Sequence, residues 1–249
     1  MKKLLIAMLP VISLVSCSFS INGLDIGMNE RMDMTETKNE NIKFEANDAE
    51  KINIDMEVGQ CSVSYGETEN VEINVRYECR GIKEKKISAA IENVKLTHEI
   101  KNEILYVRFD GLPRSDYVSC ITDLDIYLPK SFRDFEISND VGDIDLNDLS
   151  GSFDISTDVG DIKAEKITLT DYSKLETDVG NVDISLVETA ECEFEVSVDV
   201  GDIDIDTNDM EYAENEISKD YVAEEYEVVI GGNCKAELST NVGNISIRK

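Results

Sequence analysis

One repeated pattern constrains the fold of this chain more than any other feature: the string Val-Gly, then Asp or Asn, then Ile or Val, recurs in its second half. Its glycines are Gly142, Gly160, Gly180, Gly201 and Gly243, at steps of 18, 20, 21 and 42 residues. A shared register at a period near 20 residues indicates a repeat protein, in which each unit buries its apolar face only by stacking on its neighbours.

Apolar and polar residues alternate on both sides of each glycine, and this period of two indicates β-strands. Counted from the glycine, position −1 is always valine, and positions −5, +2 and +4 are apolar. The step from −1 to +2 breaks the alternation by one residue. We therefore expect each glycine to occupy a corner at positive φ, with the −1 valines facing inward. Gly59 shares this register near the start of the domain.

These repeats predict an all-β fold, a β-solenoid-like stack of glycine-cornered units of about 18–21 residues. A sandwich of hairpins is the alternative, but its strands would need no common register. One short helix is expected near 83–93, because Ile87, Ala90, Ile91 and Val94 recur at helical spacing.

The N-terminus has the features of an export signal. Lys2 and Lys3 precede an apolar run over 4–15, which is shorter than the roughly 20 residues that a membrane-spanning helix needs. The run ends in Leu-Val-Ser before Cys17, which resembles the bacterial lipobox. We expect a lipoprotein signal peptide over 1–16 and a lipid on Cys17 that holds the exported chain to a bacterial membrane. The alternative is an ordinary secretory signal that happens to contain this cysteine.

The remaining chain divides by pattern into a tether, an N-terminal part and the repeats. Residues 17–40 are polar and without periodicity, so we expect a lipid-anchored tether there. Residues 41–130 form the N-terminal β part of the domain, and 131–249 form the repeat solenoid. Within the solenoid, 207–226 is expected to be an acidic insertion without regular structure.

The acidic composition argues against two kinds of partner. The formal net charge is −29, so the chain as a whole is expected to repel nucleic acid and anionic membrane surfaces. A hydrophobic fraction of 41% is enough for a real core.

Carboxylates recur beside the corners, at positions −2 and +1. They are Asp140, Asp143, Asp158, Asp161, Asp178, Asp199 and Asp202. In a stack, equivalent residues lie about 4.8 Å apart, where two full charges repel by about 0.9 kcal/mol even in water. Two explanations stay open: a Ca²⁺ site of oxygen ligands, or a solvated edge whose Asp and Asn side chains bond turn backbones. No other cofactor is expected.

Two cysteines occupy the same repeat position, because Cys192 and Cys234 each lie nine residues before a glycine. If 207–226 is an excursion from one coil, they lie on adjacent coils and can form a disulfide. An extra coil would separate them by about 9.6 Å, too far for a bond. We predict the disulfide. Cys61, Cys79 and Cys120 follow the apolar phase of their strands and are expected to be core residues, with any bridge among them unassigned.

Enzymatic motifs are missing from the sequence. His98 is the one histidine, no triad follows from its spacing, and no P-loop or metal-binding string occurs. A carboxylate-dependent, polysaccharide-acting enzyme is therefore the weakest of the functional hypotheses.

Three stretches together resemble the DUF4097 family of candidate adhesins: 125–132, the Val-Gly repeats, and 230–247. The resemblance covers about 41–249 and implies a right-handed β-solenoid-like fold and an envelope location, with no catalytic residues. We expect a non-enzymatic, lipid-anchored cell-envelope protein, an adhesin-like module that offers a rigid acidic β face to an envelope protein or glycan. The alternative is a structural or sensing accessory protein of the envelope.

Overall fold

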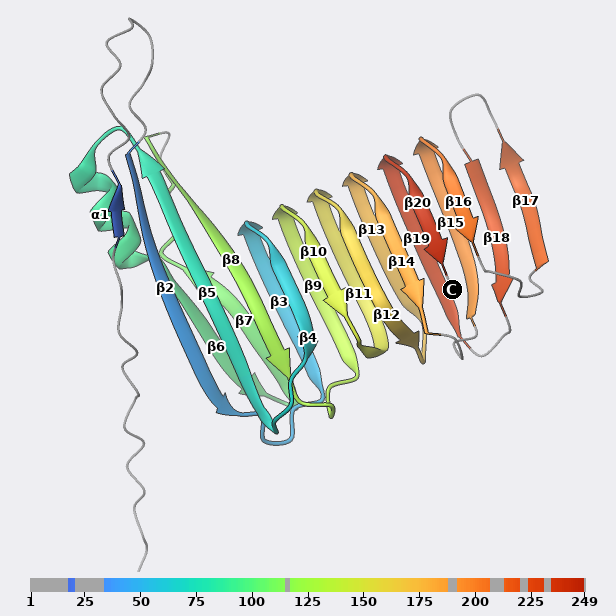
Figure 1. Ribbon diagram of the computed structural model, residues 1–249, viewed down its shortest axis with the longest axis horizontal. Coiled ribbons are helices and arrows are strands. Elements are labelled where there is room, and N and C mark those ends of the chain that lie inside the picture. Colours follow the sequence, from blue (N-terminus) through green and yellow to red (C-terminus); the bar gives the residue numbers. More distant parts are fainter. Residues whose placement is uncertain are drawn as a thin grey trace, which may run out of the picture.

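The computed structural model describes residues 18–20, 34–114, 117–187, 192–206, 213–219, 224–230 and 234–248. Figure 1 shows them as a long stack of strands with one short helix at its N-terminal end. The expected signal peptide, 1–16, and Cys17 lie outside the described residues. Within the described part of the chain, no helix is long and apolar enough to cross a membrane.

The strands form two sheets that face each other across the core. In spatial order, sheet A consists of β1 (Ser18–Ser20), β2 (Met34–Glu45), β5 (Asn70–Gly81), β8 (Val118–Leu128), β4 (Cys61–Tyr65), β10 (Ile144–Asn147), β12 (Ile162–Leu169), β14 (Val182–Leu186), β20 (Ile245–Arg248) and β16 (Ile203–Asp206). Sheet B consists of β6 (Lys95–Lys101), β7 (Ile104–Asp110), β3 (Lys51–Val58), β9 (Asp134–Val141), β11 (Ser150–Val159), β13 (Ser173–Val179), β19 (Lys235–Val242), β15 (Cys192–Val200), β18 (Glu224–Ile230) and β17 (Ala213–Lys219).

Each coil of the stack is one sheet-B strand, a glycine corner and the sheet-A strand that follows it. Equivalent positions of neighbouring coils are register partners: Ile155 pairs with Ile137 on one side and Leu175 on the other. The inner columns are buried, and the rings of Phe135 and Phe153 stack with centroids 5.0 Å apart. The all-β, solenoid-like fold class is therefore confirmed.

The coils do not follow one another in sequence order. The C-terminal coil, β19–β20, lies between β13–β14 and β15–β16, because β19 pairs in parallel with both β13 and β15. Its sheet-A strand, β20, likewise lies between β14 and β16. The chain thus passes over one position in the stack, forms the outermost coil, and returns to fill the vacant position with its last residues (Figure 1).

The expected irregular insertion at 207–226 contains strands. Strands β17 and β18 form an antiparallel hairpin, and β18 adds antiparallel to the outer edge of β15. A terminal strand leaves a row of backbone donors and acceptors unpaired, and pairing with β18 satisfies that row. The sequence did not predict this hairpin, because apolar and polar residues alternate only weakly in β17 and β18.

The N-terminal end of the stack is closed by long antiparallel strands and by α1 (Glu84–Asn93), which buries Ile87, Ala90 and Ile91. The helix agrees with the expectation for 83–93. Part of the segment expected to be a tether, 17–40, is strand, since β2 begins at Met34 and pairs with β5 over its whole length. The sequence of β2 is mostly polar, which is compatible with a strand whose side chains are all exposed or only partly buried.

Candidate functional site

The valines that precede the corner glycines form an exposed row along the edge where sheet-B strands end and sheet-A strands begin. This edge is the upper one in Figure 1. In spatial order the row is Val58, Val141, Val159, Val179, Val242 and Val200, each between 37% and 48% exposed. The inward orientation expected for them is wrong. Burial alternates only as far as position −3, and positions −2 and −1 are both exposed, because the chain begins to turn before the glycine.

Carboxylates and amides flank this row on both sides. Position −2 carries Glu57, Asp140, Asp158, Asp178, Asn241 and Asp199, and position +1 carries Gln60, Asp143, Asp161, Asn181, Asn244 and Asp202. We name the three columns at −2, −1 and +1 the corner ridge. The ridge combines aliphatic side chains with carboxylates, and it contains no lysine or arginine.

Side chains of the +1 column bond the backbone of the next coil. The amide N–H of Asp161 donates to Asp143 Oδ1 at 2.9 Å, and that of Asn181 donates to Asp161 Oδ1 at 2.8 Å. The sequence continues through Asn181 Oδ1 to the N–H of Asn244, and through Asn244 Oδ1 to the N–H of Asp202. These bonds fix the carboxylates in place and satisfy backbone groups at the corner.

Buried hydroxyls at position −3 support the corners from inside. The hydroxyls of Thr157, Thr177 and Thr240 donate to the carbonyl oxygens of Gly142, Gly160 and Gly180 in the preceding coils, at 2.9–3.2 Å. Gly160 has φ +155°, and a Cβ on it would lie 2.2 Å from the carbonyl oxygen of Gly142. The corner therefore needs glycine for both its conformation and its close approach to the next coil. Gly59, Gly142, Gly180, Gly201 and Gly243 also have positive φ.

The acidic columns are ladders rather than clusters. In the −2 column, Asn241 lies between Asp178 and Asp199, because the C-terminal coil is inserted between theirs. Within the described residues, no group of three or more His, Cys, Asp or Glu side chains could hold a metal ion. The seven aspartates considered as calcium ligands are thus spread along the ridge.

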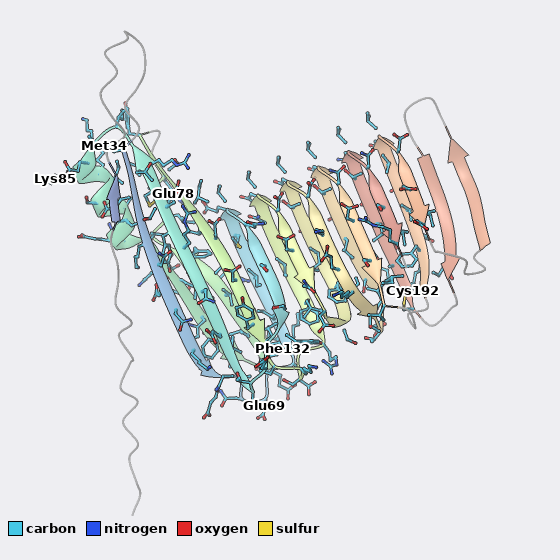
Figure 2. The ribbon with its side chains drawn as sticks, viewed as in Figure 1. Met34, Glu69, Glu78, Lys85, Phe132 and Cys192 are labelled. Atoms are coloured by element: carbon cyan, nitrogen blue, oxygen red, sulfur yellow. A yellow bond between two sulfur atoms is a disulfide. The ribbon has the colours of Figure 1, made fainter. Side chains whose placement is uncertain are left out.

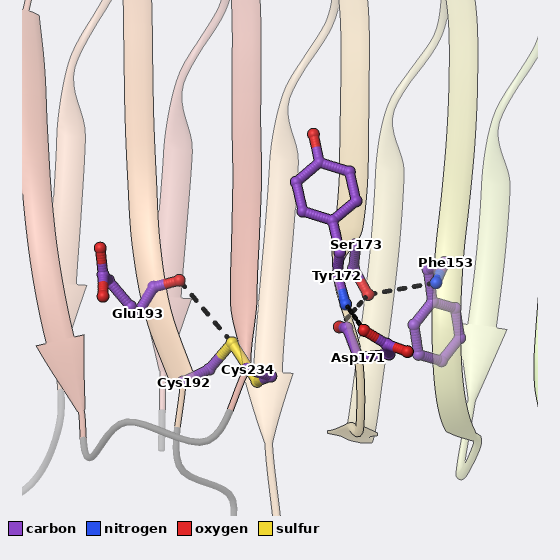
Figure 3. Close-up of a disulfide and its surroundings, with 7 residues drawn as sticks. All are labelled: Phe153, Asp171, Tyr172, Ser173, Cys192, Glu193 and Cys234. Carbon is purple, nitrogen blue, oxygen red and sulfur yellow. Dashed lines mark hydrogen bonds between the residues drawn. A yellow bond between two sulfur atoms is a disulfide. The ribbon is translucent and has the colours of Figure 1, made fainter.

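Two disulfides tie the stack together at opposite ends. Cys192 and Cys234 are bonded across adjacent coils, with Cα atoms 4.7 Å apart (Figure 3). Cys79 and Cys120 are directly opposite on the antiparallel strands β5 and β8 and are bonded as well. The sequence could not assign this second bond, because the register of β5 against β8 is not encoded in the repeat. Cys61 is buried and free, and burial raises the pKa of its thiol to about 12.

A polar groove of about 550 Å³ lies on the outer face of sheet A, over β2, β5 and β8. Several of its polar groups already have partners within the groove: Arg76 pairs with Asp123 at 3.0 Å, Asn41 donates to Asn74 at 2.6 Å, and the backbone N–H of Gln60 donates to Asp123 at 3.1 Å. A ligand there would have to replace bonds that already exist, so we regard the corner ridge as the stronger candidate site.

His98 stacks on Phe44, with ring centroids 4.2 Å apart, and partial burial lowers its pKa. A neighbouring carboxylate, Glu40, opposes that shift. This arrangement is that of a packed ring.

Comparison with known proteins identifies the fold. Residues 127–248 match the family model described as Toastrack DUF4097. A crystal structure of a candidate cell adhesion protein from Clostridium sporogenes superposes with a TM-score of 0.55 at 16% identity, covering 85% of this chain and 99% of that one. A candidate adhesin from Bacteroides fragilis matches at 12% identity with a TM-score of 0.29, covering 84% and 97%. No curated protein matches the chain.

Proposed function

Because residues 127–248 belong to the Toastrack DUF4097 family, whose fold is shared with a candidate cell adhesion protein, we propose that this chain is an adhesin-like binding module of the cell envelope. In this proposal it is non-enzymatic, is held to a membrane by a lipid on Cys17, and binds its partner through the corner ridge. The observation that carries the proposal is the exposed valine row between two columns of carboxylates.

An aligned row of exposed aliphatic side chains is unusual on a soluble surface. Register partners in adjacent coils lie about 4.8 Å apart, so the six valines extend over about 24 Å. Contiguous exposed apolar surface of this kind marks interaction sites. Water hydrates the carboxylates and amides of the −2 and +1 columns, and the valines between them stay accessible to a partner.

The ridge is also pre-organised for binding. Side chain–backbone bonds in the +1 column and threonine hydroxyls in the −3 column hold successive corners in one geometry. A valine has a single side-chain torsion, and it loses little freedom when a partner covers it. Binding therefore costs little conformational entropy, which favours a specific interaction.

The chemistry of the ridge selects a partner that is basic and partly apolar. Eight of its flanking residues are carboxylates, from Glu57 at one end to Asp199 and Asp202 at the other. A protein segment with alternating aliphatic and Lys or Arg side chains complements both columns and the valine row. A glycan is less well matched, because valine offers it neither hydrogen bonds nor an aromatic face.

Binding of the purified mature chain to isolated envelopes of the source bacterium tests this function. The variant Val159→Thr/Val179→Thr/Val242→Thr keeps β-branched shape and removes apolar surface at the ridge. Tyr127→Thr/Tyr172→Thr removes exposed aromatic surface elsewhere and is the matched control. We expect at least a tenfold loss of binding in the ridge variant and none in the control. Equal binding by all three proteins would overturn the proposed site.

The anchor is tested separately by detergent phase partitioning of the full chain expressed in bacteria. With a lipid on Cys17, the wild-type chain enters the detergent phase and Cys17→Ser stays in the aqueous phase. Identical partitioning of both proteins would contradict the anchor and leave the ridge unaffected.

A further inference from the structure

We propose that the end of the molecule formed by α1 is a membrane-contact face that binds anionic phospholipid headgroups and directs the solenoid away from the bilayer. This inference rests on the proposed envelope function, because it requires the chain to be held near a membrane. It adds the surface through which the fold itself would meet the lipid.

Positive charge is concentrated at this end. Residues 80–95 contain five lysines and arginines against two glutamates, whereas the whole chain has 24 basic and 53 acidic residues. Arg80 is paired with Glu78, so the four lysines carry the charge of this surface. Lys83, Lys85, Lys86 and Lys95 are all exposed. Each lysine or arginine near an anionic leaflet increases the membrane-binding constant about fivefold. The acidic residues of the solenoid lie farther from the leaflet, and salt screens their repulsion over about 10 Å.

Apolar surface is exposed beside these lysines. Ile82 is 40% exposed and Tyr117 is 56% exposed, and Lys86 Nζ lies 4.8 Å from the centroid of the Tyr117 ring. An aliphatic residue, a tyrosine and several lysines on one surface are the residue types that occupy the membrane–water interface. The corner ridge has apolar surface too, but its flanking carboxylates would be repelled by anionic lipid.

The chain reaches the fold at this same end. Met34, the first residue of β2, is the register partner of Gly81, which precedes α1 by three residues. Strand β1 pairs with the beginning of β2, and its Ser18 is bonded covalently to Cys17. Figure 2 shows Met34 and Lys85 together at the α1 end of the molecule. A lipid on Cys17 would therefore hold this surface close to the bilayer and raise its effective concentration there.

Docking through this face would leave the corner ridge accessible. The coils extend from the α1 end in a single direction (Figure 1). With α1 on the lipid surface, the stack projects outward and the corner ridge remains accessible along its length.

A vesicle experiment tests the face without depending on lipidation in the cell. The chain from Cys17 onward, without its lipid, is coupled through the Cys17 thiol to maleimide lipid; Cys61 is buried and the other described cysteines are in disulfides. The sequence has no tryptophan, so Tyr117→Trp introduces a single reporter. Vesicles contain brominated lipid, either zwitterionic alone or with about one third phosphatidylglycerol, the anionic composition being chosen to attract several lysines.

We expect the tryptophan at 117 to be quenched at least twofold more in anionic than in zwitterionic vesicles. Lys83→Gln/Lys85→Gln/Lys86→Gln should abolish that difference, whereas Lys101→Gln/Lys130→Gln/Lys166→Gln, three exposed lysines elsewhere, should preserve it. A tryptophan placed at Tyr172 on the solenoid should not be quenched. If Tyr117→Trp unfolds, Ile82→Trp serves as the reporter.

Equal quenching of the reporters at 117 and 172, or undiminished quenching in the first triple variant, would overturn the membrane-contact face. Failure of the wild-type chain to enter detergent would instead count against the lipid on Cys17, and failure of the ridge variant to lose envelope binding would count against the site. The three results are thus distinguishable.

Discussion

The side chain of Asn241 donates a hydrogen bond of 3.0 Å to the carboxylate of Asp178, 63 residues earlier in the chain. The contact exists because the C-terminal coil is inserted between two coils that precede it in sequence. It also places a neutral residue between Asp178 and Asp199, which would be neighbours if the coils followed sequence order. The order of the stack and the charge of the ridge are therefore linked.

Changing this asparagine to a carboxylate should destabilise the stack. In Asn241→Asp, the −2 column would become an unbroken row of six carboxylates at spacings of about 4.8 Å. Residue 241 would then repel both Asp178 and Asp199, so we expect a loss of about 2 kcal/mol in the free energy of unfolding at low salt. Most of the loss should disappear at 1 M salt, where screening is strong. Asn241→Ser removes the hydrogen bond without adding charge and is the control. Equal salt dependence of both variants in urea unfolding would contradict the assignment.

The corner glycines should tolerate no side chain. A Cβ at Gly180 would lie 1.9 Å from the carbonyl oxygen of Gly160, and its φ is +156°. We expect Gly180→Val to cost several kcal/mol or to prevent folding, because strain and overlap add. Lys163→Ala, on the solvent side of a neighbouring coil, should leave the midpoint of chemical unfolding unchanged. Similar midpoints for the two variants would argue against the corner geometry.

The sequence predicted the coil and its register but not the order of coils. The inner columns hold similar aliphatic residues in every coil, so the sequence of one coil does not specify its place in the stack. Leu238 is the register partner of both Leu175 and Val196, which precede it in the chain. The prediction that the −1 valines face inward is wrong, because the alternation of apolar and polar residues does not show where a strand begins to turn. Strand β2 was missed because its face is half-solvated, and the hairpin β17–β18 because its pairing depends on an edge that only the folded stack creates.

The cysteines show the same limit. Cys192 and Cys234 share a repeat position, which spacing reveals, whereas Cys79 and Cys120 meet only through the antiparallel register of β5 and β8. Of the candidate site, the acidic columns could be read from the repeat. The exposed valine row could not, because the alternation of the strand places these valines on the inner face.

Removal of the last coil should affect more than the residues deleted. A chain ending at residue 233 would leave the edges of β13 and β15 facing an empty position in the stack. We expect amide hydrogens of β15 and β16 to lose protection in hydrogen-exchange mass spectrometry, while those of β9–β12 keep theirs. Normal protection in β15 and β16 would mean that the coil is terminal rather than inserted.

The disulfide between Cys192 and Cys234 should stabilise the inserted coil. It joins residues 42 positions apart, and closing a loop of this length contributes about 3–4 kcal/mol in the chain-entropy treatment. We expect Cys192→Ala/Cys234→Ala to unfold at a lower denaturant concentration than the wild-type chain. The difference in midpoint should be largest under oxidising conditions, where the wild-type disulfide is intact. Peptide mapping of unreduced protein should recover the two cysteines in one linked fragment. Recovery of both as free thiols after oxidising purification would contradict the bond.

Site-specific photo-crosslinking in intact cells tests whether the corner ridge is the surface that binds the partner. A photo-reactive phenylalanine analogue at Val179 lies in the middle of the corner ridge, and one at Tyr127 lies on the outer face of sheet A with similar exposure. We expect a discrete, light-dependent adduct from position 179 that is absent from position 127. Adducts of equal yield at both positions, or an adduct from position 127 alone, would contradict it.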